Sequence, residues 1–170
     1  MAELFILLGG NVGDKAKIFE HTIKLIGESI GVITKRSSVY ETESWGFEAD
    51  LFWNQVIIIN TKLNPIEILH LTQSIEVAMG RSKKQAKHNK SNHYSDRIID
   101  IDLLFYDQLL LNTPELTIPH SKIGERLFVL VPLNELESEK YHPVLGMTIK
   151  ELLRICPDRL KVERLVDKHS

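Results

Sequence analysis

The stretch DRIIDIDLLFYD, residues 96–107, predicts a buried strand that also carries acidic groups. Most of its residues are apolar or aromatic, which is typical of a strand inside a core. Because side chains alternate along a strand, Asp100 and Asp102 are expected on one face. That face would also carry Ile98, Leu104 and Tyr106, and the opposite, wholly apolar face would carry Ile99, Ile101, Leu103 and Phe105.

The two aspartates predict a bound cation. Residues two apart on a strand are separated by about 6.6 Å, and two charges at that distance repel by roughly 2.5 kcal/mol at an effective dielectric constant of about 20. Either one carboxyl group is protonated or a cation lies between them. Mg²⁺ suits the position, since it binds one or two carboxylates and completes its shell with water and phosphate. The alternative is that Asp100 and Asp102 are solvated charges that discourage edge pairing.

A basic stretch lies directly before this strand. From Gly80 to Arg97 it holds only one anion, Asp96. Its cations are Arg81, Lys83, Lys84, Lys87, Lys90 and Arg97. A long loop of this kind is either functional or a solvated charged linker, and composition alone leaves both possibilities open. Its position next to Asp100 and Asp102 favours a metal–phosphate site.

The flanking sequence predicts alternating strands and helices, followed by hairpins. Strands are expected at 3–8, 32–41, 52–63 and 97–106. The last strand is expected to be followed by a turn at 107–108 and a hairpin partner at 109–111. Helices are expected at 15–29, 65–79, 121–126 and 148–156. Asp14, Asn64 and Thr148 are the expected N-caps. This order predicts an α+β fold with a ferredoxin-like core, in which helices flank a mostly antiparallel sheet as an α/β/α sandwich.

Composition indicates one globular domain, residues 1–170. The chain is 43% hydrophobic, has a net charge of −2 and contains a single cysteine, Cys156. One cysteine excludes an intrachain disulfide and a thiolate metal cluster, and it favours a reducing compartment, so a cytoplasmic protein is expected. The N-terminus lacks the basic region of a signal peptide, and the apolar runs are too short for a membrane span.

Other motifs are less specific. A P-loop pattern is absent from the sequence, and no His or Cys spacing matches a zinc site. The segment GGNVGD, residues 9–14, could bind an anion but more simply makes a turn. His120 is either structural or a donor to phosphate. Trp45, Phe47, Phe52 and Phe128, taken one by one, are best explained as core residues.

Eight stretches along the chain match one family in order and spacing. They are LLGGNVGD (7–14), YETESWG (40–46), FWNQVI (52–57), IEVAMGR (75–81), DRIIDIDLLFY (96–106), LTIPH (116–120), ERLFVLVPLNEL (125–136) and HPVLGMTIKELL (142–153). In these stretches the chain resembles the hydroxymethyldihydropterin pyrophosphokinases of folate biosynthesis. The resemblance implies transfer of diphosphate from ATP to the hydroxymethyl group of a dihydropterin, with release of AMP.

The resemblance also implies roles for individual residues. Asp100 and Asp102 would hold two Mg²⁺ ions, and with Arg81 and Arg97 they would form the catalytic group. Phe52 and Phe128 would stack on the pterin, whose polar edges Thr42, Trp45 and Asn54 would read. ATP would be bound by Gln73, Glu76, Arg81, Lys83, Arg97, Leu103, Thr117, His120 and Arg126. The basic stretch would be a lid that excludes water, and the protein would be a monomer with no nucleic-acid or membrane partner.

Several positions depart from the family pattern. They are Gly10 for Ser, Glu43 for Pro, Lys83 for Arg and Glu115 for a basic residue, and the basic stretch is longer than usual. Two other functions use some of the same features. A glycosyltransferase that uses D-x-D with Mn²⁺ usually needs a larger nucleotide-binding domain. A ferredoxin-like nucleic-acid-binding module would place aromatics and cations, not Asp100 and Asp102, on its open sheet face.

Overall fold

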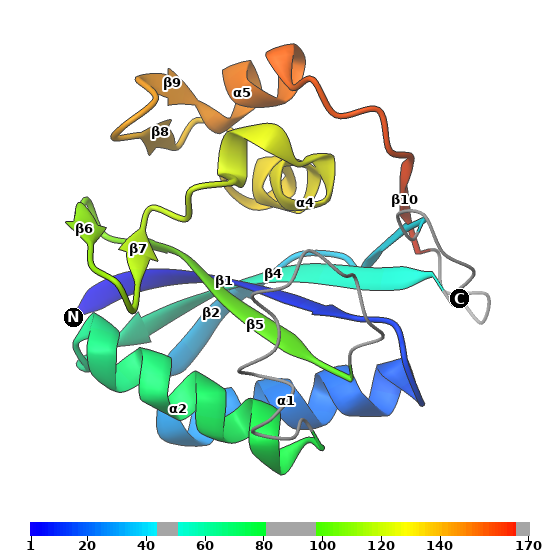
Figure 1. The fold of residues 1–170 in the computed structure, drawn as a ribbon, viewed down its shortest axis with the longest axis vertical. Helices are drawn as coiled ribbons and strands as arrows, with labels where there is room; N and C mark the ends of the chain where they lie inside the picture. Colours follow the sequence, from blue (N-terminus) through cyan, green and yellow to red (C-terminus); the bar gives the residue numbers. More distant parts are fainter. Residues whose placement is uncertain (44–50, 81–97, 166–170) are drawn as a thin grey trace.

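The computed structural model describes residues 1–43, 51–80 and 98–165, and Figure 1 shows how they are arranged. In chain order the elements are β1 (Ala2–Gly10), α1 (Lys15–Ser29), β2 (Val32–Arg36), β3 (Tyr40–Thr42), β4 (Phe52–Thr61), α2 (Pro65–Ala78), β5 (Asp100–Tyr106), β6 (Leu111–Asn112), β7 (Thr117–Ile118), the 3₁₀ turn η1 (Ile123–Glu125), α4 (Leu127–Glu137), β8 (Tyr141–His142), β9 (Met147–Thr148), α5 (Ile149–Ile155) and β10 (Val162–Arg164). None of the helices in these described ranges has the length and apolar character needed to cross a membrane.

The main sheet is built around β1, which lies between β4 and β5 and runs antiparallel to both. Strands β2 and β3 pair with successive parts of β4, and β10 pairs with β3. Since α1 connects β1 to β2 and α2 connects β4 to β5, the order is that of a ferredoxin-like core. The predicted α+β fold with a mostly antiparallel sheet is confirmed.

Helices cover both faces of this sheet, with α1 and α2 on one face and α4 and α5 on the other (Figure 1). Because strand side chains alternate, β1 supplies both layers. Leu4, Ile6 and Leu8 belong to the core against α1 and α2, whereas Phe5 and Leu7 belong to the core against α4 and α5. The predicted α/β/α sandwich is therefore confirmed.

Three helices begin where the sequence predicts. The Asp14 side chain accepts a backbone N–H in the first turn of α1. At α2, Asn64 and Glu67 each accept the other's backbone N–H at 2.9 Å, which completes a capping box. Thr148 accepts the N–H of Glu151 at the start of α5. N-cap residues predict the starts of these helices correctly because a cap satisfies N–H groups that the helix itself leaves unbonded.

Strand β5 contains a bulge that changes the face occupied by its last residues. The pairing with β1 skips Leu104, so Leu103 and Phe105 lie opposite consecutive residues of β1. A bulge places two residues opposite one and reverses the alternation beyond it. Phe105 consequently packs in the core against α4, while Tyr106 packs on the α1–α2 face. The predicted faces of Phe105 and Tyr106 were wrong for this reason.

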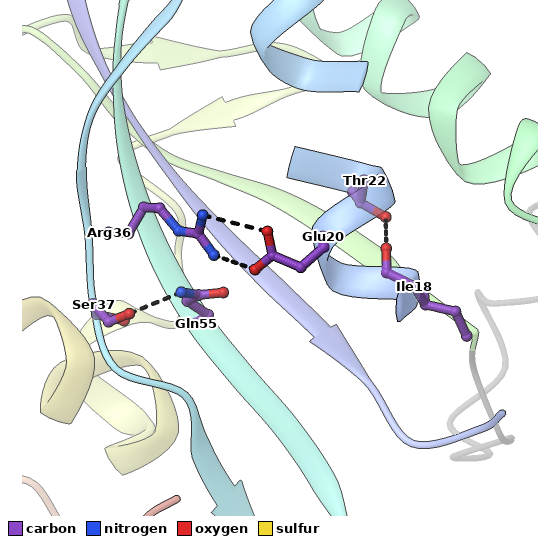
Figure 2. A network of polar contacts seen from close by, with 6 residues as sticks. All are labelled: Ile18, Glu20, Thr22, Arg36, Ser37 and Gln55. Carbon is purple, nitrogen blue, oxygen red and sulfur yellow. Dashed lines mark hydrogen bonds and ion pairs between the residues drawn. The ribbon is translucent and has the colours of Figure 1, made fainter. Parts of the chain in front are cut away.

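The stretch 32–41, predicted as one strand, forms the two strands β2 and β3. Between them the Ser37 hydroxyl accepts the N–H of Val56 at 2.9 Å, taking the place of a backbone carbonyl in the ladder. The Gln55 side chain donates to the Ser37 carbonyl at 2.8 Å, as Figure 2 shows. In the same figure Arg36, at the end of β2, forms an ion pair with Glu20 of α1. A side chain that competes with the ladder thus divides the strand.

The hairpin predicted after β5 is also wrong. A turn follows Tyr106, but β6 then pairs with β7 and not with β5. Asp107 is held against the start of β1, since its N–H donates to the Glu3 carbonyl and its carboxylate accepts the Glu3 N–H. Its φ of 47° turns the chain away at this point, so the next residues leave the sheet.

Helix α4 was not among the helices expected from the sequence. Pro132 lies in its middle, and proline usually ends a helix. Its residues Val129, Leu130 and Leu133 are buried in the core shared with α5. Further apolar side chains, those of Leu127, Phe128 and Leu136, are partly buried against the same core, so no single narrow amphipathic stripe marks the helix. Tertiary packing therefore stabilises a helix that local sequence rules would interrupt.

Candidate active site

A cavity lies at the end of the sheet where β5 begins, and we call it the aromatic cavity. Its lining brings together seven of the predicted site residues, Thr42, Phe52, Asn54, Asp100, Asp102, Arg126 and Phe128. They come from β3, β4, β5 and the start of α4. Residues that are far apart in the sequence and were predicted for pterin, metal and ATP thus meet in one place.

Asp100 and Asp102 both face the aromatic cavity, as alternation along the strand predicts. On the neighbouring strand β1 they lie opposite Gly9 and Leu7, which line the same cavity. Both aspartates are half-buried. The bulge in β5 comes two residues later and leaves this part of the register intact.

Asn54 is a buried amide at the wall of the aromatic cavity. Its side-chain NH₂ group donates to the Thr42 hydroxyl at 3.2 Å, and it is only 4% exposed. A Cβ atom at Gly9 would lie 3.3 Å from the Asn54 side-chain oxygen, which is tighter than an ordinary contact. Glycine at this position therefore lets Asn54 lie close against β1 and fixes a polar group at the cavity wall.

Helix α4 presents Arg126 and Phe128 at its N-terminus, with the guanidinium 5.6 Å from the centre of the Phe128 ring. Further along this helix, Glu135 accepts the Tyr40 hydroxyl at 2.6 Å and the Ser38 N–H at 2.9 Å. Burial and the bond to Glu135 raise the pKa of Tyr40 to about 12. These bonds fasten α4 to the residues that lead into β3, so they hold two walls of the aromatic cavity together.

A second cavity, which we call the His120 cavity, borders the aromatic cavity at Asp102. It contains three residues predicted for ATP, Leu103, Thr117 and His120, and it shares Asp102 with the aromatic cavity. The remaining lining residues are Leu69, Ile101, Glu115, Leu116 and Ser121. The lining therefore combines apolar and polar side chains, which suits a nucleoside.

The hydrogen bonds of His120 determine its tautomer. Its Nδ1 accepts the backbone N–H of Lys122 at 3.1 Å, so the neutral ring carries its proton on Nε2. Its own backbone N–H donates to the Leu104 carbonyl. Burial lowers the pKa of His120, Arg126 lowers it further, and Asp100 acts in the opposite direction. At neutral pH the ring is thus a neutral donor through Nε2.

We expect His120 to titrate at a lower pH in the folded, metal-free protein than in the same protein unfolded in urea. Because the folded pKa lies below the usual value of 6.5, the neutral ring stabilises the fold above that pH, and this contribution is lost as the pH falls. NMR titration of the imidazole carbons, assigned with a His120→Gln variant, measures the shift. Equal midpoints in the folded and unfolded states would contradict the role of burial.

The two helix residues predicted for ATP lie in different environments. Gln73 is exposed on α2, whereas Glu76 is buried and accepts the N–H of Ile101 at 3.2 Å. Neither residue lines the two cavities described above. This hydrogen bond, which the Glu76 carboxylate accepts, holds α2 against β5, the strand that carries both aspartates.

Four predicted residues lie outside the described part of the chain. They are Trp45, Arg81, Lys83 and Arg97. The same is true of the basic stretch predicted to form a lid. Their roles stay predictions.

The acidic residues fit a metal that is shared with a substrate. Within the described ranges, no group of three or more His, Cys, Asp or Glu side chains is arranged to hold an ion. The carboxylates that line the aromatic cavity are those of Asp100 and Asp102, which lie two apart on β5, and that of Glu43. Mg²⁺ binds through one or two carboxylates when substrate phosphates and water supply its other ligands. The donor set therefore matches Mg²⁺ bound together with a nucleotide.

Comparison with known proteins assigns the chain to a family. Residues 5–138 match the family model of 7,8-dihydro-6-hydroxymethylpterin-pyrophosphokinase. The chain belongs to this family. A pyrophosphokinase from Porphyromonas gingivalis is 36% identical over 137 residues, which cover 79% of this chain and 90% of the relative. The Bacillus subtilis 2-amino-4-hydroxy-6-hydroxymethyldihydropteridine pyrophosphokinase is 33% identical over 98% of this chain and 97% of the relative.

Solved HPPK-DHPS structures share the fold. A wild-type HPPK-DHPS chain from Plasmodium falciparum superposes with a TM-score of 0.73 at 18% identity, over 90% of this chain. An HPPK-DHPS complex with substrates gives a TM-score of 0.71 at 16% identity. This chain spans 44% and 43% of those two longer chains.

Some cavity residues were not among the predicted site residues of the pyrophosphokinase. In the aromatic cavity they are Leu7, Gly9, Glu43 and Leu160. Leu7 and Gly9 could have been found from the pairing of β1 with β5, had that pairing been predicted. Glu43 and Glu115 depart from the family pattern and have no predicted role in the site, and Leu160 follows the last predicted helix, where no motif points to it.

Proposed function

We propose that this chain transfers diphosphate from ATP to the hydroxymethyl group of 6-hydroxymethyl-7,8-dihydropterin and releases AMP, a step of folate biosynthesis. In the reaction the hydroxyl oxygen forms a bond to the β phosphorus of ATP. The bond from that phosphorus to the oxygen bridging the α and β phosphates breaks, AMP leaves and the hydroxyl proton is released. Membership of the family supports this activity, and it sets aside the glycosyltransferase and the nucleic-acid-binding module.

The observation that carries the proposal is that Asp102 lies at the junction of two unlike cavities. The aromatic cavity suits a flat polar heterocycle, because Phe52 and Phe128 supply rings and Asn54 supplies a buried amide. The His120 cavity would hold the nucleoside end of ATP. The phosphates would then pass Asp102 on their way to the acceptor hydroxyl, which brings the reacting groups together.

Individual residues of the chain would bind and orient the two substrates. The neutral ring of His120 would donate from Nε2 to a phosphate oxygen, and Arg126 would supply a positive charge near the moving diphosphate. Thr42 and Asn54 already form a hydrogen-bonded pair, so they would present a fixed pattern of donors and acceptors to the pterin edge. A pattern fixed in advance costs less ordering entropy on binding.

Asp100 and Asp102 would hold magnesium, which when bound would neutralise charge on the phosphate oxygens. Two ions are expected from the resemblance to the family. Among the residues outside the described ranges, Arg81, Lys83 and Arg97 would add positive charge for the phosphates, and Trp45 would contact the pterin. One domain over residues 1–170, a monomeric state and a cytoplasmic location stay predictions.

The activity is tested by following nucleotides during turnover. We expect AMP to form from ATP only when Mg²⁺ and hydroxymethyldihydropterin are both present, and we expect chelation of the metal to stop the reaction. Chromatographic separation of AMP, ADP and the pterin product measures this. Formation of ADP, or AMP formation that does not depend on the pterin, would contradict the proposed reaction.

A further inference from the structure

The chain that follows the last helix, residues 157–164, runs from α5 down to the edge of the main sheet (Figure 1). We call it the C-terminal segment. It lies beyond residues 5–138, which match the family model. Leu160 of this segment nevertheless lines the aromatic cavity together with Phe52 and Phe128. An apolar side chain from outside the matched region therefore forms part of the site.

Asp158 fixes the position of Leu160 relative to α4. One oxygen of its carboxylate accepts the Leu160 N–H at 2.9 Å, and the other accepts the Leu127 N–H at 3.0 Å. Leu127 is the first residue of α4 and lies between Arg126 and Phe128. The residue before the helix gives it no side-chain cap, so Asp158 satisfies an N–H that the helix leaves unbonded.

Strand β10 fixes the other end of the C-terminal segment. It pairs with β3 so that Val162 lies opposite Thr42, a residue of the aromatic cavity. Beyond it, the Leu165 N–H donates to the Val39 carbonyl at 2.8 Å. Leu160 thus lies between an anchor on α4 and an anchor on β3, which carry two different walls of the cavity.

We propose that the C-terminal segment is a wall of the pterin site, in which Leu160 contacts the bound dihydropterin and Asp158 is a positioning residue for Leu160. The inference rests on the proposed function and extends it by adding a binding residue. Leucine would cover apolar surface of the heterocycle next to the aromatic rings, which is the usual construction of such sites. The segment would act on the pterin and not on ATP, since Leu160 lines the aromatic cavity and does not line the His120 cavity.

The test compares Leu160→Ala with a matched control, Ile155→Ala. Ile155 ends α5, is 58% exposed and lines neither cavity. In Leu160→Ala we expect the KM for hydroxymethyldihydropterin to rise roughly tenfold, because apolar contact area is lost. The KM for ATP and the kcat should stay within about twofold of the wild type, and Ile155→Ala should match the wild type throughout. Calorimetric titration of the pterin in the presence of a non-hydrolysable ATP analogue should show the same loss of affinity.

Two further variants separate contact from general destabilisation. Leu160→Trp fills the cavity and should also raise the pterin KM, although it adds apolar surface. Asp158→Ala should raise the pterin KM through the loss of both hydrogen bonds, and Asp158→Asn should recover part of the affinity because its amide oxygen still accepts one N–H. If Asp158→Ala raises the KM for ATP as much as the KM for the pterin, the positioning role of Asp158 is refuted.

Failure of this inference can be distinguished from failure of the proposed function. If the wild-type chain forms AMP in a pterin-dependent reaction while Leu160→Ala and Leu160→Trp both keep the wild-type KM for the pterin, the proposed contact between Leu160 and the pterin is refuted. The proposed activity is then unaffected. If the wild-type chain shows no pterin-dependent AMP formation, the proposed function is refuted, and this inference with it.

Discussion

Replacing Asp102 with Asn is expected to lower kcat at least about a thousandfold while leaving the fold intact. Asp102 is the residue shared by the aromatic and His120 cavities, so its carboxylate lies where the phosphates would pass. A metal that polarises phosphate oxygens contributes several kcal/mol to transition-state stabilisation, and each loss of about 1.4 kcal/mol lowers the rate tenfold. Asparagine keeps the shape of the side chain and removes the charge that is proposed to hold the cation. The measurement is the rate of AMP formation at saturating ATP, pterin and Mg²⁺.

Asp107→Asn is the matched control for this prediction. Asp107 ends the same stretch of chain, and its carboxylate accepts the Glu3 N–H at 2.8 Å, a bond that an asparagine oxygen can also accept. Asparagine also tolerates the positive φ at this position. Both variants should melt near the wild-type temperature, and Asp107→Asn should keep normal activity. A folded Asp102→Asn variant with near-normal kcat would refute the metal-binding role.

The position of the aspartates could be predicted from the sequence because it depends on a local rule. Alternation along a strand places Asp100 and Asp102 on one face whatever the rest of the chain does. Caps such as Asp14 and Asn64 are equally local, since the side chain bonds to an N–H within its own helix turn. The order of strands and helices then restricts the topology to a few folds.

The errors arose where distant contacts decide the local structure. The bulge at Leu104 depends on the pairing of β5 with β1, and no pattern within the strand marks it. The break at Ser37 depends on bonds to Val56 and Gln55 of another strand. Helix α4 forms in spite of Pro132 because it is packed between the sheet and α5. Tertiary contacts outweigh local preferences of about 1–3 kcal/mol in such places.

The extent of the site could be predicted only in part for the same reason. The family resemblance predicts residues that bind substrates and metal, and seven of these predicted residues meet in the aromatic cavity. Leu160 follows the last predicted helix, and only the bonds of Asp158 and the pairing of β10 bring it to the cavity. A residue of this kind is recognised from the fold and not from a motif.

Replacing Phe128 with Ala is expected to raise the KM for hydroxymethyldihydropterin by roughly 5-fold to 150-fold. Phe128 and Phe52 are the aromatic residues lining the cavity in the described part of the chain, and they come from the start of α4 and the start of β4. Stacking a flat heterocycle on an aromatic side chain contributes roughly 1–3 kcal/mol in comparable nucleobase sites. The KM for ATP should change little, because Phe128 does not line the His120 cavity. Steady-state kinetics with each substrate varied in turn measures both constants.

Phe128→Tyr distinguishes stacking from the second contact of this ring. The Arg126 guanidinium lies 5.6 Å from the centre of the Phe128 ring, so Phe128→Ala also removes a partner of Arg126. Tyrosine keeps both the ring face and the cation–π contact, and it should therefore bind the pterin nearly as well as the wild type. If Phe128→Ala raises the KM for ATP as much as that for the pterin, the ring acts mainly through Arg126. If Phe128→Ala is folded and leaves the KM for the pterin unchanged, the aromatic cavity is not the acceptor site. The assignment of the pterin to the aromatic cavity and of ATP to the His120 cavity is then wrong.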